Sequence, residues 1–589
     1  MNTAMRFRTQ RRWTGESLWI AAWVLLCAWT ASAQDVLPGQ DRPELPSYSE
    51  PELESQVLQL PLVPRFEPPP ITPGDVLPPL PLAEGEDTDG LRGGSLVTLT
   101  EIRVLGNTVL LQETLDTVRR PYLGRELGFE ELQELRDALT AAYVERGYVT
   151  SGAVVRSQSL TDGVLEVWII EGRLTEIQVH TDGRLHRSYV ERRIASMAEA
   201  IVNVNDLERR LRVLQQDERI QALEASLLPG QQRGEAVLRV RVIEARPYYA
   251  RFRGNNYSSP VIGSGRGEIL LGWNDVSGGG DAMQVEYKGG VGLQDVQVRY
   301  EVPLNAYDTR FGLHLRRTWT DVVEAPFDDF GIKGETATYG FSLRHPFYRT
   351  PETTVETFLR GEWRRSKTFL FGEPFSFVSG PDAGVSKLAV LRLGGNWTWR
   401  ADGHVLAARS VFNIGLPIFG ATDHSGDIPD GKFFSWLGQV QWAERLPNFW
   451  DVQILARADV QLSDRPLLGI EQFAVGGHAT VRGYRENRLV RDNGLVGSLE
   501  IRVPVPFPSW GGWQPHFALT PFFDAGYSWN TDRMEIGATT LLSAGIGGRL
   551  AINENILVDV NWGKALNDVE TVGDDLQDNG LHIGASYTW

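Results

Sequence analysis

The sequence has almost no cysteine: of its 589 residues only Cys27 is one, and it lies in an N-terminal segment described below. The rest of the chain therefore cannot form an internal disulfide or use a thiolate as a nucleophile or metal ligand. The nine histidines show no metal-ligand spacing. No P-loop, H-E-x-x-H or G-x-S-x-G motif occurs. We therefore expect no catalytic residues, no metal, no cofactor and no enzymatic activity.

Long apolar runs and excess positive charge are also missing. After the N-terminus no stretch approaches about 18 consecutive apolar residues, so the sequence predicts no membrane-spanning helix. Lysine and arginine number 58 against 75 aspartates and glutamates, which gives a formal net charge of -17. Nucleic-acid binding needs a basic footprint, so this class of protein is excluded. The run Ser277-Gly278-Gly279-Gly280 is predicted to be a turn rather than a phosphate cradle.

Residues 1–33 are typical of a cleaved secretory signal peptide. Four arginines precede an apolar stretch at 18–29, and Ala31-Ser32-Ala33 supplies a small-residue cleavage site. An uncleaved membrane anchor is the alternative, but the apolar stretch is short. The mature chain is therefore expected to start near residue 34. A secreted soluble protein and an outer-membrane β-barrel both remain compatible with export.

Residues 34–95 form a proline-rich segment. Thirteen of the 32 prolines lie between Pro38 and Pro81, and such sequence stays extended. One island at 49–60 differs, because Ser49 and Glu52 have the spacing of a capping box before leucines on one helical face. It is either a short helix that docks elsewhere or a transient turn in a linker.

Two repeats follow, at 96–172 and 173–246. Each spans roughly 75 residues and reads β-α-α-β-β, which indicates tandem small α+β domains. Strands are predicted at 97–107, 163–172, 173–183 and 235–245, and amphipathic helices at 129–148 and 205–219. Gly147 is a suitable residue for ending the first of these helices.

From 247 to 589 the helical periodicity disappears and strands alternate between apolar and polar residues, as at 296–304 and 556–564. A soluble sandwich also alternates, but two features favour a membrane barrel. Thirteen of the 18 tryptophans lie in this region, and aromatic residues concentrate at the rims of such barrels. The chain also ends on an aromatic strand at 580–589, in which Gly584, Tyr587 and Trp589 are the candidate assembly signal.

The length of this region predicts an antiparallel barrel of about 16 strands, at about 21 residues for each strand and its connection. Counting back from the last strand places residues 478–494 between strands 11 and 12, in an extracellular loop. This loop contains the sequence VRGY, and FFDAG follows on the second strand after it. The residues of interest are Val481, Arg482, Gly483 and Tyr484 in the loop, and Phe522, Asp524 and Gly526 on the strand.

These features together resemble the superfamily of outer-membrane protein-assembly and two-partner secretion proteins. Its members carry V-R-G-[FY] in the sixth extracellular loop and F-x-D-x-G on the barrel wall, and the two repeats resemble POTRA domains. The resemblance implies that the loop folds into the lumen and that Arg482 pairs with Asp524. A guanidinium suits a carboxylate bidentately, and Gly483 permits a tight backbone turn.

Two POTRA units after a proline-rich segment resemble the TpsB branch. The resemblance implies an outer-membrane protein of a Gram-negative bacterium, with periplasmic POTRA domains, that secretes a large unfolded TpsA-like client such as a hemolysin or adhesin. Outer-membrane lipids, the barrel-assembly machinery and periplasmic chaperones are the other expected partners. A general insertase for membrane barrels and a passive porin or receptor are the alternatives. In the family a helix plugs the lumen, and residues 49–60 are the candidate for it.

Overall fold

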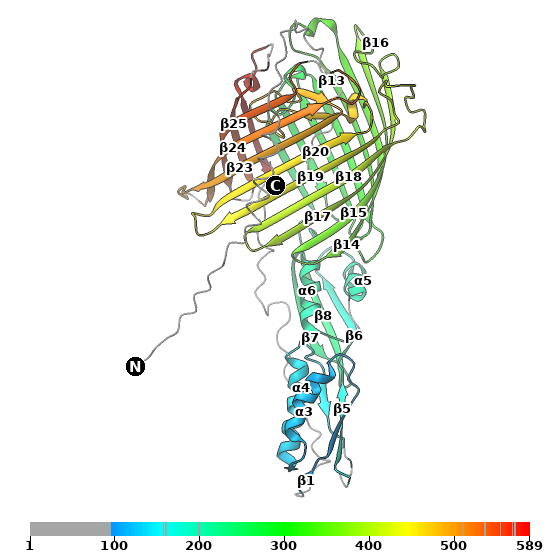
Figure 1. Cartoon of the computed structure of the whole chain (residues 1–589), viewed down its shortest axis with the longest axis vertical. Helices are drawn as coiled ribbons and strands as arrows, with labels where there is room; N and C mark the ends of the chain where they lie inside the picture. The colour runs from blue at the N-terminus through cyan, green and yellow to red at the C-terminus, as the bar shows by residue number, and fades with distance from the viewer. Residues whose placement is uncertain are drawn as a thin grey trace.

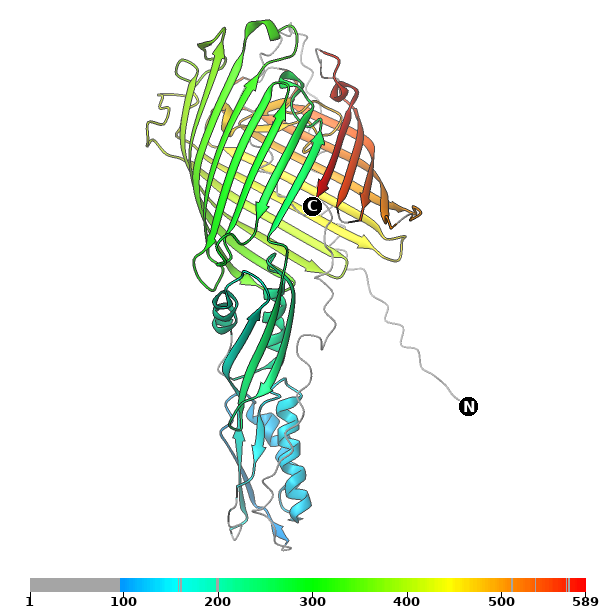
Figure 2. The ribbon, with the colours of Figure 1, turned by 180° about the vertical axis from the view of Figure 1, so that it is seen from behind.

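The computed structural model describes residues 96–589 except 157, 159–161, 198–200, 510–511, 535–536, 554, 568 and 570–572. The predicted signal peptide (1–33), the proline-rich segment (34–95) and the possible helix at 49–60 lie outside the described residues. Two small α+β units are stacked end to end, and a large barrel stands on the second of them (Figures 1 and 2).

The first unit packs two helices on a three-stranded sheet of order β2-β5-β4, with β1 and β3 paired beside it. Its long helix buries Leu132, Leu135, Leu139 and Tyr143, whose spacing of three or four residues places them on one face. Gly147 follows the helix with a φ of +91°. The elements are β1 (Val97–Thr98), β2 (Glu101–Leu105), α3 (Gln112–Arg119), η1 (Arg120–Tyr122), β3 (Glu126–Leu127), α4 (Phe129–Val144), β4 (Gly152–Val154) and β5 (Val164–Ile170).

The second unit repeats this plan with a sheet of order β6-β8-β7, in which β6 and β8 are parallel. Asn203 caps its second helix by accepting hydrogen bonds from the backbone N–H groups of Asn205 and Asp206. The β-α-α-β-β order expected from the sequence is therefore present in both units. The elements are β6 (Arg173–Thr181), α5 (Arg187–Met197), α6 (Val204–Gln215), β7 (Ile220–Pro229) and β8 (Glu235–Glu244).

The C-terminal region forms a closed antiparallel barrel of 16 strands, as predicted. An additional two-residue strand, β16 (Glu373–Pro374), pairs with the end of β15. The barrel strands are β9 (Tyr248–Asn255), β10 (Arg266–Trp273), β11 (Ala282–Gly290), β12 (Leu293–Pro303), β13 (Arg310–Asp321), β14 (Lys333–Arg349), β15 (Thr353–Leu370), β17 (Val385–Ala401), β18 (His404–Gly415), β19 (Phe434–Leu446), β20 (Val452–Ser463), β23 (Asn493–Val505), β24 (Pro515–Trp529), β25 (Thr540–Ile552), β26 (Ile556–Ala565) and β27 (Leu581–Thr588).

The wall of the barrel has an apolar outside and a charged inside, because successive side chains of a strand point to opposite faces. Exposed outward residues include Leu271, Leu313 and Trp562, whereas Asp295 and Arg392 are buried on the lumen side. Closure joins the first and last strands, and the backbones of Ala250 and Trp589 exchange hydrogen bonds at this seam. Among the described residues, no helix combines the length and the apolar character needed to cross a membrane.

Candidate functional site: a loop held inside the barrel

The connection between β20 and β23, residues 464–492, enters the lumen instead of extending outside. We call it loop 6, because it is the sixth connection on the side of the barrel away from the two units. Its β21 (Phe473–Val475) and β22 (Leu489–Arg491) form a small hairpin. Val475, Val481 and Tyr484 belong to a buried apolar cluster with residues of the wall, which are Phe358, Val411, Leu437, Val496 and Leu541. The loop therefore packs against several strands across the lumen.

The structure brings Arg482 and Asp524 together. The Nε and Nη2 atoms of Arg482 donate to the two carboxylate oxygens of Asp524 at 2.8 Å and 3.0 Å, and the Arg482 backbone N–H donates to the same group at 3.1 Å. The Arg482 residue is 7% exposed and Asp524 is 0% exposed. Two of these hydrogen bonds form a bidentate guanidinium–carboxylate pair, which fixes the side chain. The third comes from the backbone N–H and fixes the loop backbone.

Sequence reasoning missed two partners of this pair. Glu500 on β23 accepts from Nη1 of Arg482 at 2.6 Å, so the guanidinium faces two carboxylates. Ser498 donates to Asp524 at 2.6 Å. Phe522 lies under the guanidinium, 3.6 Å from its central carbon to the ring centroid, which is cation–π geometry. Glu500 was visible in the sequence as a charged residue at a lumen-facing position of a strand, but its partner was not.

Two glycines of the motifs make room for this packing. Gly483 has a φ of +94°, and a Cβ there would lie 2.9 Å from the backbone carbonyl of Gly563 on β26. Gly526 faces the lumen two residues after Asp524, and its Cβ would lie 2.3 Å from Val475 and 2.9 Å from Val481. A side chain at either position would push the loop away from the wall. The alternation of β24 thus places Phe522, Asp524 and Gly526 together on the face that receives the loop.

Tyr484 extends the contact to the next strands. Its hydroxyl lies 2.8 Å from the carbonyl oxygen of Leu542 on β25 and within hydrogen-bonding distance of Asn567. Arg485 then pairs with Asp578 and, through Nη1, with Glu324 at 3.0 Å. Loop 6 is therefore fixed through Arg482, Tyr484 and Arg485 to strands β24 and β25 and to two further connections of the barrel.

The candidate assembly residues lie on the seam between β27 and β9, where five residue pairs form the ladder. Trp589 stacks on Tyr248 with ring centroids 5.8 Å apart, and the guanidinium of Arg246 lies 4.9 Å from its ring. Tyr587 points outward. Gly584 faces inward, and a Cβ there would lie 2.5 Å from the hydroxyl oxygen of Tyr257. The seam is thus held at its end by aromatic contacts of the last residue.

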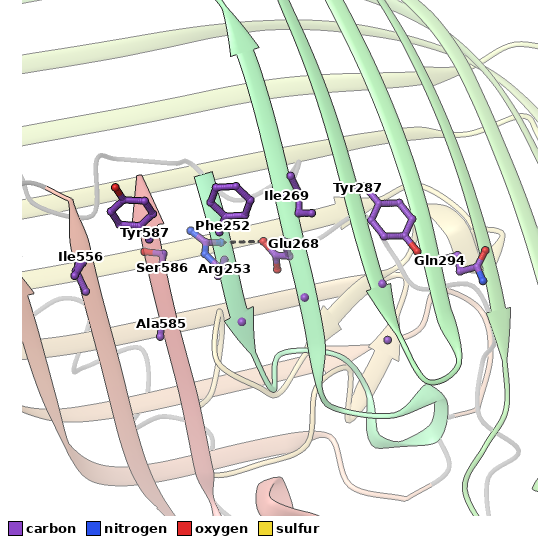
Figure 3. Close-up of a pocket in the computed structure, with 14 residues that line it drawn as sticks. Phe252, Arg253, Glu268, Ile269, Tyr287, Gln294, Ile556, Ala585, Ser586 and Tyr587 are labelled. Carbon is purple, nitrogen blue, oxygen red and sulfur yellow. Dashed lines mark hydrogen bonds and ion pairs between the residues drawn. The ribbon is translucent and has the colours of Figure 1, made fainter. Parts of the chain in front are cut away.

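The outer wall is hollow beside this seam. Gly254, Gly267 and Gly289 stand in register on β9, β10 and β11, and a Cβ at Gly254 or Gly267 would meet no atom within 4 Å. A groove of about 880 Å³ lies over them (Figure 3). The larger apolar and aromatic side chains that line it are Phe252, Ile269, Tyr287, Ile556 and Tyr587. The side-chain cover of the wall is therefore thin where the barrel closes.

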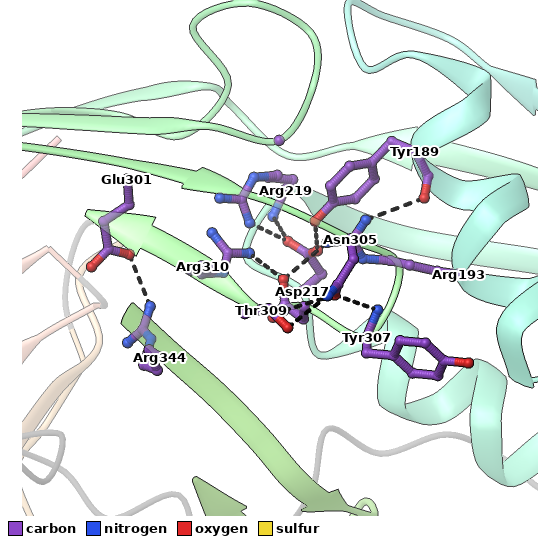
Figure 4. A network of polar contacts seen from close by, with 12 residues as sticks. Tyr189, Arg193, Asp217, Arg219, Glu301, Asn305, Tyr307, Thr309, Arg310 and Arg344 are labelled. Atoms are coloured by element: carbon purple, nitrogen blue, oxygen red, sulfur yellow. Dashed lines mark hydrogen bonds and ion pairs between the residues drawn. The ribbon is translucent and has the colours of Figure 1, made fainter. Parts of the chain in front are cut away.

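A polar junction joins the second α+β unit to the near end of the barrel (Figure 4). Arg193 on α5 and Arg310 on β13 both bind Asp308 in the β12–β13 turn, each at 2.9 Å. Beside them, Asp217 accepts from the Tyr189 hydroxyl at 2.6 Å and from Arg219 at 2.8 Å. The guanidinium of Arg193 also lies 3.5 Å from the ring centroid of Tyr189, which links the two carboxylate clusters.

Charge balance keeps both junction carboxylates ionised. Burial by itself raises the pKa of Asp217, but Arg219 and the Tyr189 hydroxyl stabilise the carboxylate more strongly, so the pKa is lowered. The pKa of Asp308 is also lowered, because Arg310 and Arg193 outweigh the effect of burial.

The glycine-rich turn at 277–280 packs against the same unit. The backbone N–H of His186 donates to the Gly278 carbonyl at 2.8 Å, and a Cβ on Gly280 would lie 2.1 Å from the Tyr189 ring. The predicted turn is therefore present, and its small residues allow the barrel to approach the unit closely.

The part of the chain that the structure describes contains no group of three or more His, Cys, Asp or Glu side chains placed to hold a metal ion. The site consists of a loop, its contacts with the wall, and the junction below it.

Comparison with known proteins identifies the family. The model of the haemolysin secretion/activation protein family ShlB/FhaC/HecB matches residues 234–550, and that of the ShlB-type POTRA domain matches 97–172. The outer membrane transporter CdiB of Escherichia coli is 26% identical over 428 residues, which cover 71% of this chain and 70% of that protein. The heme/hemopexin transporter protein HuxB of Haemophilus influenzae is 21% identical over 498 residues, or 80% and 84% of the two chains.

The solved structure of CdiB from Escherichia coli has the same fold, with a TM-score of 0.65 and 21% identity over 87% of this chain and 94% of that one. The family match covers more than half of the chain and includes loop 6 and β24. The chain therefore belongs to the ShlB/FhaC/HecB family of haemolysin secretion/activation proteins, and it is an outer-membrane transporter of the two-partner secretion type with POTRA domains in the periplasm.

Proposed function

We propose that this transporter exports one large TpsA-like client, such as a hemolysin or adhesin, as an unfolded chain across the outer membrane. The observation that carries the proposal is the position of loop 6. The barrel, which belongs to a family of transporters, holds this loop inside its lumen through Arg482 and Asp524. A chain that passes through the barrel must share the lumen with this loop. The sequence has no nucleotide motif, so folding of the client outside the cell is the proposed driving force.

In this proposal the pair of Arg482 and Asp524 positions loop 6 during export. The neighbouring motif residues serve the same contact: Gly483 permits the turn, Val481 and Gly526 pack against each other, and Tyr484 holds β25. Support comes from the burial of the pair and from its bidentate geometry. No residue of the site acts as a catalyst in this mechanism.

The POTRA domains capture the client by strand addition in our proposal. Their sheets end in β2 and β4 in the first domain and in β6 and β7 in the second, and within the described residues no further strand pairs with these edges. An extended client segment can add to such an edge through backbone hydrogen bonds. We assign residues 96–172 and 173–246 to the two domains, and the junction at Asp308 directs the second toward the barrel mouth.

Biogenesis adds further proposed partners. We propose that periplasmic chaperones deliver the chain after removal of residues 1–33, and that the barrel-assembly machinery reads Gly584, Tyr587 and Trp589 in the last strand. Outer-membrane lipids then surround the apolar outer wall of the 247–589 barrel. Residues 34–95 precede the first POTRA domain.

The client gene provides the test. We expect a gene beside that of the transporter to encode a large exported protein with a β-helix-like repeat pattern. Expression of both proteins should place the client in the medium, and deletion of the transporter should leave it in the periplasm. The amounts of other outer-membrane barrels should not change.

The two alternatives predict different results. A general insertase would make other barrels disappear from the outer membrane when the transporter is depleted. A passive porin would conduct solutes and leave no exported protein dependent on it. Either result would contradict the proposed function. A client that reaches the medium without the transporter would also contradict it.

A further inference from the structure

A second group of charges holds loop 6 to a different part of the wall. Glu471 ends η4 (Gly469–Glu471), close to where the loop leaves β20. Its carboxylate accepts from Arg364 on β15 at 2.6 Å and from Arg392 on β17 at 2.9 Å and 3.1 Å. In the order of the barrel, β18, β19, β20 and β23 separate these strands from β24, which carries Asp524. The loop is thus tied to two separate sectors of the barrel.

The side chains of this group are buried. Exposure is 1% for Arg364, 3% for Glu471 and 9% for Arg392, although the two arginines belong to a wall that faces the lumen. Arg392 also donates to Glu362 at 3.0 Å, and a guanidinium nitrogen of Arg360 lies 3.7 Å from the same carboxylate, so three guanidiniums face two carboxylates. Burying charges is costly unless each has a partner, and removal of one partner leaves the others uncompensated. We call Glu471, Arg364, Arg392 and Glu362 the root clasp.

Backbone and apolar contacts support the root clasp. Arg364 donates to the carbonyl of Ile470 at 3.1 Å, and Gln461 on β20 donates to the carbonyl of Glu471 at 3.0 Å. The surrounding apolar residues form a buried cluster with two residues of β17; its members are Leu388, Val390, Phe433, Leu467, Leu468 and Ile470. The carboxylate therefore has a fixed position relative to the wall.

We infer that Glu471 is a positioning residue, which holds the beginning of loop 6 across the lumen independently of the Arg482–Asp524 pair. With both contacts the loop bridges two sectors of the wall and obstructs the lumen. Loss of the root clasp frees the first part of the loop, while Arg482 still fixes the second part. Loop 6 obstructs the lumen for any solute, and this part of the inference needs no client. The effect on client export rests on the proposed function.

The test uses the full-length transporter in planar lipid bilayers and in cells. Glu471→Gln keeps the size of the side chain and removes its charge. We expect the mean ion current at a fixed voltage to rise several-fold, with more frequent and longer openings. Gly469→Cys in η4, in the first part of the loop, in a chain whose other cysteine is Cys27 of the signal segment, should react with a membrane-impermeant maleimide faster by about tenfold in the Gln variant. Glu373→Gln on the exposed strand β16 is the matched control and should change neither value.

Heat-modifiable mobility measures the folded fraction in each sample. Unchanged current and unchanged labelling in folded Glu471→Gln would overturn the inference, as would an equal response in the control. If Glu471→Gln does not assemble, Arg392→Gln removes one of the two arginines and should shift both readouts in the same direction. Failure of both variants to assemble would show that the clasp is needed for folding and would also overturn its role as a restraint.

The design separates this inference from the proposed function. Ion current and thiol labelling need no client, so they can fail only through the role of Glu471. A wild-type transporter that secretes no client would instead contradict the proposed function. Combining Glu471→Gln with Arg482→Ala should raise the current above that of either single variant, because two separate restraints are removed. A double variant no more open than Arg482→Ala alone would overturn the independence of the two contacts.

Discussion

Arg482 in loop 6 and Asp524 on β24 form a buried bidentate ion pair, with nitrogen–oxygen distances of 2.8 Å and 3.0 Å. The two residues are 42 positions apart in the chain. Their contact holds the connection between β20 and β23 inside the lumen. Glu500 adds a second carboxylate to the same guanidinium. The loop is consequently held by charge as well as by the apolar cluster around Val481.

The first prediction concerns this pair. Arg482→Ala and Asp524→Ala should each insert at near-normal levels and secrete the client poorly, because breaking a buried pair costs about 3–5 kcal/mol, while the strand ladder of the barrel remains. The double variant should be little worse than either single one, since coupled residues are not additive. The measurement is client in the medium per folded transporter. Arg299→Ala on β12, an exposed position, is the control; strict additivity would contradict the pairing.

The family resemblance implied the pairing of Arg482 with Asp524, whereas the placement of these residues follows from sequence periodicity. The two-residue repeat of a strand places Phe522, Asp524 and Gly526 on one face, and counting strands back from Trp589 places VRGY between strands 11 and 12. The structure has this arrangement, with loop 6 between β20 and β23. Such local rules act over a few residues, so one sequence is enough to apply them.

The root clasp could not be predicted in the same way. Glu471 lies 107 positions from Arg364 and 79 from Arg392, and nothing in their local patterns links them. Lumen-facing arginines are common in barrel strands, so their partners become visible only when the wall curves and the loop enters. The pairing partners of the predicted strand at 97–107 could not be predicted from the local sequence either. It is divided into β1 and β2, because β1 pairs with β3 whereas β2 pairs with β5.

The second prediction is an acid-sensitive junction. The lowered pKa values of Asp217 and Asp308 mean that their contribution to junction stability is complete above the ordinary aspartate pKa of about 3.9 and is lost as the pH falls through the folded-state values. Spin labels at Gln178→Cys and Asn448→Cys should give one narrow distance distribution at neutral pH and a broader one in acid.

A variant separates this titration from general acid effects. Asp308→Asn removes the carboxylate shared by Arg193 and Arg310 and should broaden the distribution already at neutral pH. Asp137→Asn on the exposed face of α4 should leave it narrow. A narrow distribution in Asp308→Asn would show that other contacts suffice to fix the domain. Client secretion should fall with the broadening, because the captured chain is no longer delivered to the barrel mouth.

The third prediction tests client capture. Deletion of residues 97–246 should leave a folded barrel in the outer membrane. The strand ladder from β9 to β27 closes on itself and includes none of the deleted residues. Secretion should stop, because the strand edges of β2, β4, β6 and β7 are removed with the domains. Heat-modifiable mobility reports the barrel, and the client is measured in the periplasm and the medium. Normal secretion from this variant would refute capture by these domains.

The last prediction concerns closure of the barrel. Trp589→Ala should lower the amount of assembled transporter and leave the client secreted per folded molecule unchanged. Trp589 ends the closing strand, stacks on Tyr248 and exchanges backbone hydrogen bonds with Ala250. An aromatic pair contributes about 0.5–1.5 kcal/mol, too little to unfold a completed barrel, so the defect should arise while the seam forms.

Trp562→Ala is the matched control for this defect. Trp562 is also an exposed, outward-facing tryptophan, but it lies within β26 and not at the seam. Its loss removes similar aromatic surface from the lipid-facing wall and should leave assembly near normal. Equal assembly of the two variants would mean that the terminal aromatic residue has no special role. A lower secretion per folded molecule in Trp589→Ala would instead place this residue in export, because the seam would then matter after closure.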